Sequence, residues 1–170
     1  GTGNASVTVA NTEPTVDSVS VTPSSGVDTS TTLTCSATAS DDDGDSPTLS
    51  YAWTNDSTAL GSGASLTLSN TTSSPDDSIP CTATATDADG GTDTDSASVT
   101  VENTDPTFTA SASISPSSGV DTATTLTCSA TATDADGDTP TVTYAWANDT
   151  QGTSLGTGST LTLTSSTASP

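Results

Sequence analysis

A long internal repeat constrains the fold of this chain more than any other feature of its sequence. Residues 21–40 read VTPSSGVDTSTTLTCSATAS, and residues 114–133 read ISPSSGVDTATTLTCSATAT. The offset of about 93 residues is an ordinary length for one β-sandwich domain. A shorter match joins SVTVANTEPT at residues 6–15 to SVTVENTDPT at residues 98–107, where a proline interrupts the strand pattern. The sequence therefore predicts tandem units joined by short linkers that contain proline.

The repeats divide the chain into one whole unit and two partial ones. We expect residues 1–14 to be the last strand of a preceding repeat plus a linker, residues 15–106 to be a complete repeat, and residues 107–170 to be a second repeat that lacks its last two strands. An open sheet edge in that second repeat would be a liability. We therefore expect another stretch of polypeptide to cover it, either residues 5–12 of a neighbouring copy or a further part of a longer chain.

Alternation of apolar and polar residues in the complete repeat predicts short antiparallel strands and no helix. The inward-facing sets, in chain order, are Val19 and Val21; Leu33, Cys35, Ala37 and Ala39; Leu49, Tyr51 and Trp53; Leu66 and Leu68; Ile79, Cys81, Ala83 and Ala85; and Ala97, Val99 and Val101. Six or seven strands in about 90 residues predict an all-β fold of tandem immunoglobulin-like antiparallel β-sandwiches.

Two of the three cysteines lie on strands that we expect in opposite sheets. Cys35 belongs to the second strand and Cys81 to the sixth, and Trp53 lies between them in the sequence. This order is typical of immunoglobulin domains with an inter-sheet disulfide, which would place the protein at the cell surface or in the extracellular space. The alternative is a pair of buried, reduced cysteines. Cys128 corresponds to Cys35, and we expect its partner in the missing part of the second repeat.

The charge balance excludes several classes of partner and activity. The chain has 21 acidic residues and no lysine, arginine or histidine, which gives a formal net charge of −21. Because affinity for nucleic acids and for anionic membranes depends on Lys and Arg, we expect neither partner. No apolar run approaches the roughly 18 residues of a membrane span, so we expect no membrane insertion. Without His or Lys there is no ordinary base to activate a serine nucleophile, and we predict that the protein is not an enzyme.

Aspartates cluster in loops that we expect at one end of each repeat. The sequence DDDGD at residues 41–45 returns as DADGD at residues 134–138, and TDADGGTDTD at residues 86–95 joins strands six and seven. Oxygen ligands from several loops are what Ca²⁺ prefers, and the chain offers no His for softer metals. The alternative is a set of solvated turns, because Asp, Asn and Gly are common turn residues. The candidate calcium ligands are Asn11, Glu13, Asp41, Asp43, Asp45, Asp87, Asp89, Asn103, Asp105, Asp134, Asp136 and Asp138.

Two segments resemble cadherin repeats. ATDADGDTPTVTY at residues 132–144 is similar to the ATDADxGxNxxxxY stretch of that family, and VTVENTDPTF at residues 99–108 is similar to its calcium-binding linker. The complete repeat, with SYAWTND after an acidic loop, also resembles PKD-like and other immunoglobulin-like repeats of large bacterial surface proteins. By the cadherin pattern, Ca²⁺ would be bound at the second joint by Asp134, Asp136, Asn103 and Asp105, and at the first joint by Asp41, Asp43, Asn11 and Glu13. The Asp-Arg-Glu motif of cadherins is missing; its candidate replacements are Asp76 and Asp77, or Asp28.

Four N-x-[ST] sequons are candidate sites for N-linked glycans. They begin at Asn4, Asn55, Asn70 and Asn148. Sequons also arise by chance in a chain so rich in Thr, and O-linked sugars on Ser and Thr are an equal alternative.

Together these features predict the function of a structural repeat. We expect a unit of an extracellular fibre, stalk or adhesin that is stabilised by calcium, carries glycans and assembles head-to-tail with itself. The alternative is a carbohydrate-binding or accessory module of a large secreted protein, and such a module needs an exposed aromatic platform. Trp53 and Trp146 fall on the inward-facing phase of their strands, so their burial discriminates between the two functions.

Overall fold

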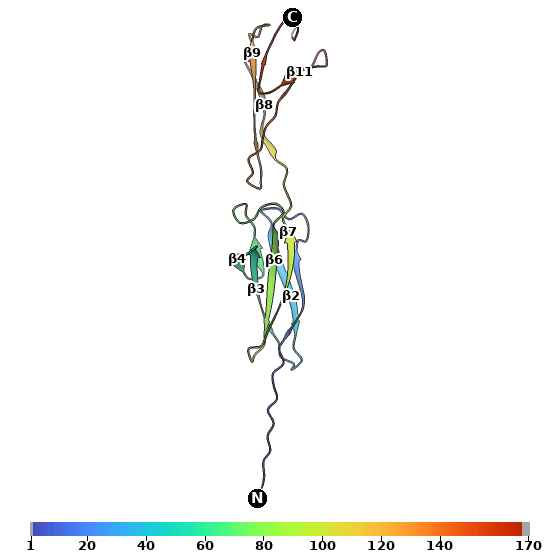
Figure 1. Ribbon diagram of the computed structural model, residues 1–170, viewed down its shortest axis with the longest axis vertical. Coiled ribbons are helices and arrows are strands. Elements are labelled where there is room, and N and C mark those ends of the chain that lie inside the picture. Colours follow the sequence, from blue (N-terminus) through green and yellow to red (C-terminus); the bar gives the residue numbers. More distant parts are fainter. Residues whose placement is uncertain (1, 168–170) are drawn as a thin grey trace. The chain divides into compact units, whose positions relative to one another are not determined.

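The fold is all-β: in the computed structural model, residues 2–167 are described and form twelve strands and no helix (Figure 1). Every pair of hydrogen-bonded strands is antiparallel. The chain separates into two compact units, Gly1–Asn103 and Thr104–Pro170. In the described range there is no helix that could cross a membrane.

The first unit contains two antiparallel sheets. Its strands are β1 (Thr15–Thr22), β2 (Thr32–Ser40), β3 (Thr48–Asn55), β4 (Thr58–Ser62), β5 (Ser65–Thr67), β6 (Ser78–Thr86) and β7 (Thr92–Thr100). One sheet has the order β1-β2-β5 and the other the order β4-β3-β6-β7. The strand β4, with the sequence TALGS, is not marked by alternation. It forms because the chain reverses at Asp56, which has a φ of 49°, a conformation that aspartate tolerates better than most residues.

Side chains from both sheets form one core. Leu33 of β2, Trp53 of β3 and Ile79 of β6 are all completely buried and belong to the same cluster. The Nε1 atom of Trp53 donates a hydrogen bond to the carbonyl oxygen of Gly63 at 2.9 Å, so the largest core side chain leaves no donor unpaired. The strands therefore follow the expected alternation because each has one face in this core.

A disulfide joins the two sheets, which confirms the predicted pair. Cys35 of β2 and Cys81 of β6 are bonded, with their Cα atoms 6.4 Å apart and a sequence separation of 46 residues. The alternative of two reduced cysteines is therefore wrong. In the chain-entropy treatment a closed loop of this length stabilises the folded state by about 4 kcal/mol. A disulfide is compatible with a secreted protein.

The second unit repeats only part of this arrangement in its described residues. Its strands are β8 (Thr107–Ser115), β9 (Thr125–Thr133), β10 (Ala145–Asn148), β11 (Thr153–Thr157) and β12 (Thr160–Thr162). They form a sheet of order β12-β9-β8 and a hairpin of β10 and β11. Trp146 repeats the bond of Trp53, since its Nε1 donates to the carbonyl oxygen of Gly158 at 2.7 Å. Between residues 104 and 167 no strand corresponds to β6 or β7.

Candidate functional site: the acidic loops that bind the linkers

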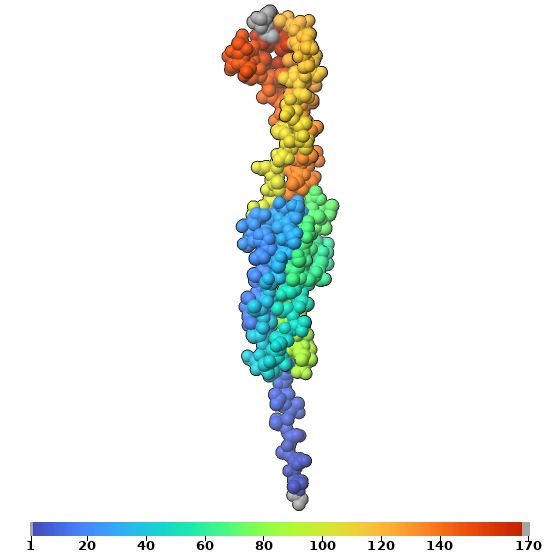
Figure 2. Space-filling view, turned by 180° about the vertical axis from the view of Figure 1, so that it is seen from behind, coloured from blue at the N-terminus to red at the C-terminus, as the bar shows by residue number. Residues whose placement is uncertain are grey.

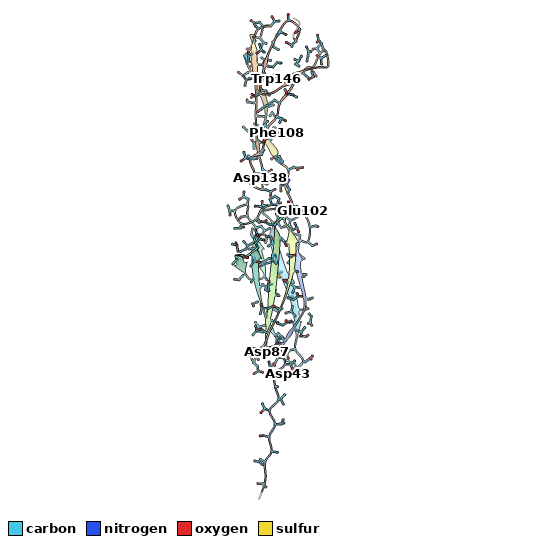
Figure 3. The ribbon with its side chains drawn as sticks, viewed as in Figure 1. Asp43, Asp87, Glu102, Phe108, Asp138 and Trp146 are labelled. Atoms are coloured by element: carbon cyan, nitrogen blue, oxygen red, sulfur yellow. A yellow bond between two sulfur atoms is a disulfide. The ribbon has the colours of Figure 1, made fainter. Side chains whose placement is uncertain are left out.

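The candidate site lies at the end of the first unit where the N-terminal segment enters it. Residues 2–13 precede β1 as an exposed segment outside the sheets (Figure 2). The loop after β2 carries Asp43 and the loop between β6 and β7 carries Asp87, and Figure 3 shows both at this end, with Glu102 at the opposite end of the unit. The structure thus brings two of the predicted acidic loops together at one end of the unit.

Asp87 is a buried residue whose carboxylate accepts three hydrogen bonds. Its Oδ2 accepts a bond from the side-chain amide of Asn11 at 2.9 Å. Its Oδ1 accepts bonds from the backbone amides of Asp89 at 2.9 Å and Gly91 at 2.8 Å, and the backbone amide of Asp87 itself donates to the carbonyl oxygen of Gly91 at 3.1 Å. The bond from Asn11 is the main cause that lowers the pKa of Asp87 below its ordinary value, against the opposing effect of burial. Asp87 is therefore ionised at neutral pH and ties the linker to this loop.

The side chain of Asp43 binds the backbone of the linker. The backbone amide of Thr12 donates to Oδ2 of Asp43 at 2.6 Å. The turn that presents Asp43 is fixed by Asp41, whose Oδ1 accepts the backbone amide of Asp43 at 2.7 Å and whose carbonyl oxygen accepts the amide of Gly44 at 3.2 Å. Gly44 has a φ of 86°, in the left-handed region where glycine carries no steric cost. The loop sequence DDDGD thus holds the carboxylate of Asp43 where it accepts a hydrogen bond from the linker backbone.

The Oδ2 atom of Asp41 differs from the other acidic oxygens. It is buried, and among the described residues it is the one buried side-chain oxygen or nitrogen without a hydrogen-bond donor. A buried carboxylate oxygen without a donor is costly, and no Lys, Arg or His exists in the chain to offset it. This oxygen is therefore the one buried acceptor of the described loops that no donor satisfies.

Gly91 has a role that sequence reasoning missed. A Cβ atom at this position would collide with Oδ2 of Asp87 and would lie 3.1 Å from Nδ2 of Asn11. Only glycine therefore leaves room for the bond between Asn11 and Asp87. The available signal was the pair Gly90–Gly91, since one glycine suffices for the turn and the second needs another reason.

The same linker contact recurs in the second unit. The backbone amide of Thr104 donates to Oδ2 of Asp136 at 2.7 Å, and the backbone amide of Asp136 donates to Oδ1 of Asp134 at 2.8 Å. These residues stand in the sequence where Thr12, Asp43 and Asp41 stand in the first unit. Asp136 is 7 % exposed, as is Asp87.

The remaining predicted ligands lie apart from these contacts or on the surface. The side chains of Glu13, Asp45, Asp89, Asn103, Asp105 and Asp138 are exposed. Nowhere in residues 2–167 do three or more Asp, Glu or Cys side chains form a group that could hold a metal ion. In the described residues, the acidic loops therefore do not form a complete set of metal ligands.

Asp28 and Asp77, two of the candidate replacements for the cadherin motif, accept hydrogen bonds within the first unit. Asp28 accepts bonds from the backbone and side chain of Ser30, at 2.9 and 2.8 Å, and from the hydroxyl of Thr31 at 2.8 Å. These bonds, led by the backbone amide of Ser30, lower the pKa of Asp28. Asp77 accepts the side-chain amide of Asn55 at 2.6 Å. The side chain of Asp76 is exposed, and its positive φ of 70° belongs to a turn.

The four sequons differ in how far their asparagine amides are engaged. Nδ2 of Asn55 donates to Asp77 and to the carbonyl oxygen of Thr72 at 3.0 Å, so a glycan there would displace a bond. Nδ2 of Asn148 donates to the carbonyl oxygen of Thr167 at 3.3 Å. Asn4 and Asn70 have exposed side chains. Glycan attachment stays a prediction, with Asn4 and Asn70 the more accessible positions.

In comparisons with known proteins, no family model, no curated protein and no solved structure matches this chain.

Proposed function

We propose that the protein is a structural, non-catalytic repeat unit of an extracellular fibre, stalk or adhesin, built from tandem immunoglobulin-like sandwiches that follow one another head-to-tail. One observation carries the proposal: in both units the linker backbone is bound by the acidic loop of the unit that follows it. Thr12 donates to Asp43 at 2.6 Å and Thr104 donates to Asp136 at 2.7 Å. A repeated contact of this kind holds the linker backbone on a defined path into each unit, as a structural repeat protein requires.

The immunoglobulin-like interpretation has separate support. The first unit packs a three-stranded sheet and a four-stranded sheet around one core. A disulfide crosses that core beside a buried tryptophan, as in immunoglobulin domains. The resemblance of the acidic loops and linkers to cadherin and PKD-like repeats points to the same class of extracellular protein.

Calcium is the cofactor that fits these loops best. The donors are carboxylates, an asparagine amide and backbone carbonyls, all of which are ligands that Ca²⁺ accepts. The buried Oδ2 of Asp41 lacks a donor, and the net charge of −21 has no internal counter-charge. Because no group of three acidic side chains is ready-made in residues 2–167, binding would have to draw neighbouring oxygens closer. A bound ion would supply positive charge that links loop to linker.

The carbohydrate-binding alternative loses its main support. Trp53 is completely buried and Trp146 is 8 % exposed, so neither offers a flat aromatic surface to a sugar ring. We therefore place the structural function first.

Amide ¹⁵N relaxation of the intact protein tests the central contact. We expect the amides of Thr12 and Thr104 to be as ordered as those of the strands. Asp43→Ala should mobilise Thr12 alone and Asp136→Ala should mobilise Thr104 alone, so each variant is the control for the other. Linker amides as mobile as those of residues 2–9 in the unaltered protein would overturn the fibre proposal.

Calorimetry in Ca²⁺ and in EDTA tests the cofactor. We expect Ca²⁺ to raise the melting temperature, because an ion that binds only the folded state stabilises it by mass action. Asp41→Asn should remove that rise, whereas Asp42→Asn, an exposed neighbour in the same loop, should keep it. Equal melting temperatures in Ca²⁺ and EDTA would rule out the calcium part and leave the linker contacts standing.

A further inference from the structure

Two of the four sequons lie beside one groove of the first unit, and their asparagines differ in what the fold asks of them. We propose that Asn70 carries an N-linked glycan whose first sugar lies in this groove, whereas Asn55 keeps its amide for structural hydrogen bonds. The inference goes beyond the proposed function because it assigns a modification site. It rests on the proposed extracellular location but not on the linker contacts.

The groove lies between the hairpin of β3 and β4 and the turn that follows Leu68. It has a volume of about 350 Å³ and is lined by five of the residues 55–60 and by Thr71 and Thr72. This volume is in the range of small-ligand sites. The walls offer hydroxyls, a carboxylate and an amide together with the half-buried side chain of Leu60. A sugar ring combines hydroxyl groups with apolar C–H faces in the same way, so the groove fits one.

A well-bonded turn presents Asn70 beside this groove. Asn70 directly precedes Thr71 and Thr72, which line the wall. The carbonyl oxygen of Ser69 accepts the backbone amides of Thr72 and Ser73, both at 2.9 Å. The hydroxyl of Ser69 lies 2.9 Å from the hydroxyls of both Thr71 and Thr72. The side chain of Asn70 is exposed, so its Nδ2 atom is open to an enzyme and has room for a bulky substituent.

The side-chain amide of Asn55 is fully used by the fold. Its Nδ2 donates to the carbonyl oxygen of Thr72 at 3.0 Å and to Oδ2 of Asp77 at 2.6 Å. An amide nitrogen has two hydrogens, and an N-linked glycan replaces one of them, so a glycan here would break one of the two bonds. The bond to Thr72 joins the hairpin to the turn, which are the two walls of the groove. Asn55 therefore builds the groove and is not the residue that carries the sugar.

The second unit keeps the structural asparagine and has no asparagine on the turn. Asn148 stands where Asn55 stands, and its Nδ2 donates to the carbonyl oxygen of Thr167 at 3.3 Å. The turn recurs as well, since the backbone amide of Thr167 donates to the carbonyl oxygen of Thr164 at 3.0 Å. The position of Asn70 is taken by Ser165, so no sequon begins there. The asparagine that binds the turn thus recurs in both units, as a structural role requires.

The attachment step needs a sugar donor and no oxidant or reductant. Nδ2 of Asn70 forms a bond to C1 of an amino sugar while the bond from C1 to the oxygen of a lipid-linked pyrophosphate breaks. The amide proton leaves with the pyrophosphate, and a membrane-bound transferase that reads N-x-[ST] catalyses the exchange. In the folded unit the attached sugar then lies next to the exposed hydroxyls of Thr58 and Thr71.

Glycopeptide mapping of the protein from its natural source is the direct test. Cleavage on the N-terminal side of Asp places each sequon on its own peptide: residues 45–55 for Asn55, 56–75 for Asn70 and 138–148 for Asn148. We expect a glycan on Asn70 in most molecules and none on the other two. A bare Asn70, or a glycan on Asn55 or Asn148, would overturn the proposal.

Protein secreted by cells that attach N-acetylglucosamine tests where the first sugar lies. Ser6→Ala, Ser57→Ala and Thr150→Ala remove the other three sequons and keep their asparagines. We expect nuclear Overhauser effects between the N-acetyl methyl group and the methyl groups of Leu60. Trimming the glycan to one sugar should preserve the melting temperature of the first unit, and removing it completely should lower that temperature by about 2 °C or more. A glycan without contact to Leu60 and without effect on melting would rule out the groove as its seat.

Two matched controls complete the test. The amidase that removes the whole glycan converts the asparagine to aspartate, so Asn70→Asp protein should melt like the deglycosylated form. Asn55→Ala should lower the melting temperature of the first unit, whereas Ser57→Ala, which removes the same sequon but keeps the amide, should not. Equal melting of these two variants would refute the structural role of Asn55. None of these measurements involves the linker amides, so the glycan site and the fibre proposal can fail independently.

Discussion

Leu33 and Leu126 occupy the same place in the repeated sequence, yet Leu33 is completely buried and Leu126 is only half-buried. The strands around them form the same local pairs: β2 with β1 and β5, and β9 with β8 and β12. What differs is the hairpin β6–β7, which brings Ile79, Cys81 and Val99 to the first core. The comparison teaches that these strands acquire their pairing locally, whereas their burial depends on segments more than 40 residues away.

Removing the disulfide should cause the largest loss of stability, and the loss should fall on the first unit alone. We expect Cys35→Ala with Cys81→Ala to lower the free energy of unfolding of the first unit by about 4 kcal/mol, because the unfolded chain regains its loop entropy. Urea unfolding followed by fluorescence of Trp53, in a Trp146→Phe background, measures the loss. Cys128→Ala is the matched control and should change the first unit by less than about 0.5 kcal/mol. A loss under about 1 kcal/mol in the double variant would contradict the expectation.

Gly91→Ala should disturb the linker end of the first unit and leave the second unit unchanged. The new methyl group would collide with Asp87, and overpacking of this kind costs on the order of 1–3 kcal/mol. Thermal unfolding measures the cost, and the amide shift of Thr12 reports on the linker. Gly61→Ala is the control, because its Cβ would lie 3.6 Å from Leu66, an ordinary contact distance. Equal stability of the two variants would show that the loop can move aside.

Acid should weaken the first unit through Asp87, which has no counterpart in the described part of the second unit. The pKa of Asp87 is lower in the folded state than in the unfolded chain, so its contribution is complete above the ordinary Asp pKa of about 3.9. That contribution is lost as the pH falls through the lowered folded pKa. Asn11→Ala should raise the pKa of Asp87, measured by NMR titration, and reduce the loss of stability between pH 5 and pH 2. An unchanged pKa would remove Asn11 as the main cause.

The smallest expected difference lies in a turn that both units share. Asp28 and Asp121 cap equivalent turns, and backbone and hydroxyl donors lower the pKa of both. Asp28 has one more donor, the hydroxyl of Ser30, where the second unit has Ala123. Ser30→Ala should therefore raise the pKa of Asp28 towards that of Asp121, and Ala123→Ser should lower the pKa of Asp121. NMR titration of both carboxyl groups in one sample checks this, and opposite changes would refute it.

The sequence predicted most of the strands and the cysteine pair, because a period of two determines which side chains share a face. Cys35 and Cys81 fall on inward phases of strands in different sheets, which favoured a disulfide over reduced thiols, and the structure shows the bond. The strand β4 could not be placed from its own residues, since TALGS shows no alternation and its pairing depends on the turn at Asp56. The expectation of six or seven strands in about 90 residues was compatible with this extra strand but did not locate it.

The candidate site was predicted less completely. The acidic loops and the linkers were expected to meet at the joints, but the individual hydrogen bonds were not predicted, because the partners lie far apart in the chain. Thr12 is 31 residues from Asp43, and Asn11 is 76 residues from Asp87. Such contacts depend on how loops approach one another in space, which periodicity does not encode. The clash that makes Gly91 necessary is hidden for the same reason.

The disulfide also determines how the first unit would respond to a pull on its two ends. Tension that enters at β1 passes from Cys35 directly to Cys81, so the segment between them carries no load. Those 46 residues would add roughly 150 Å of slack if they were free to extend. With the bond intact, a unit that gives way lengthens only by the chain outside the bridge. A chain of units with such a bridge would lengthen in short steps, and about half of each unit would stay protected from the load.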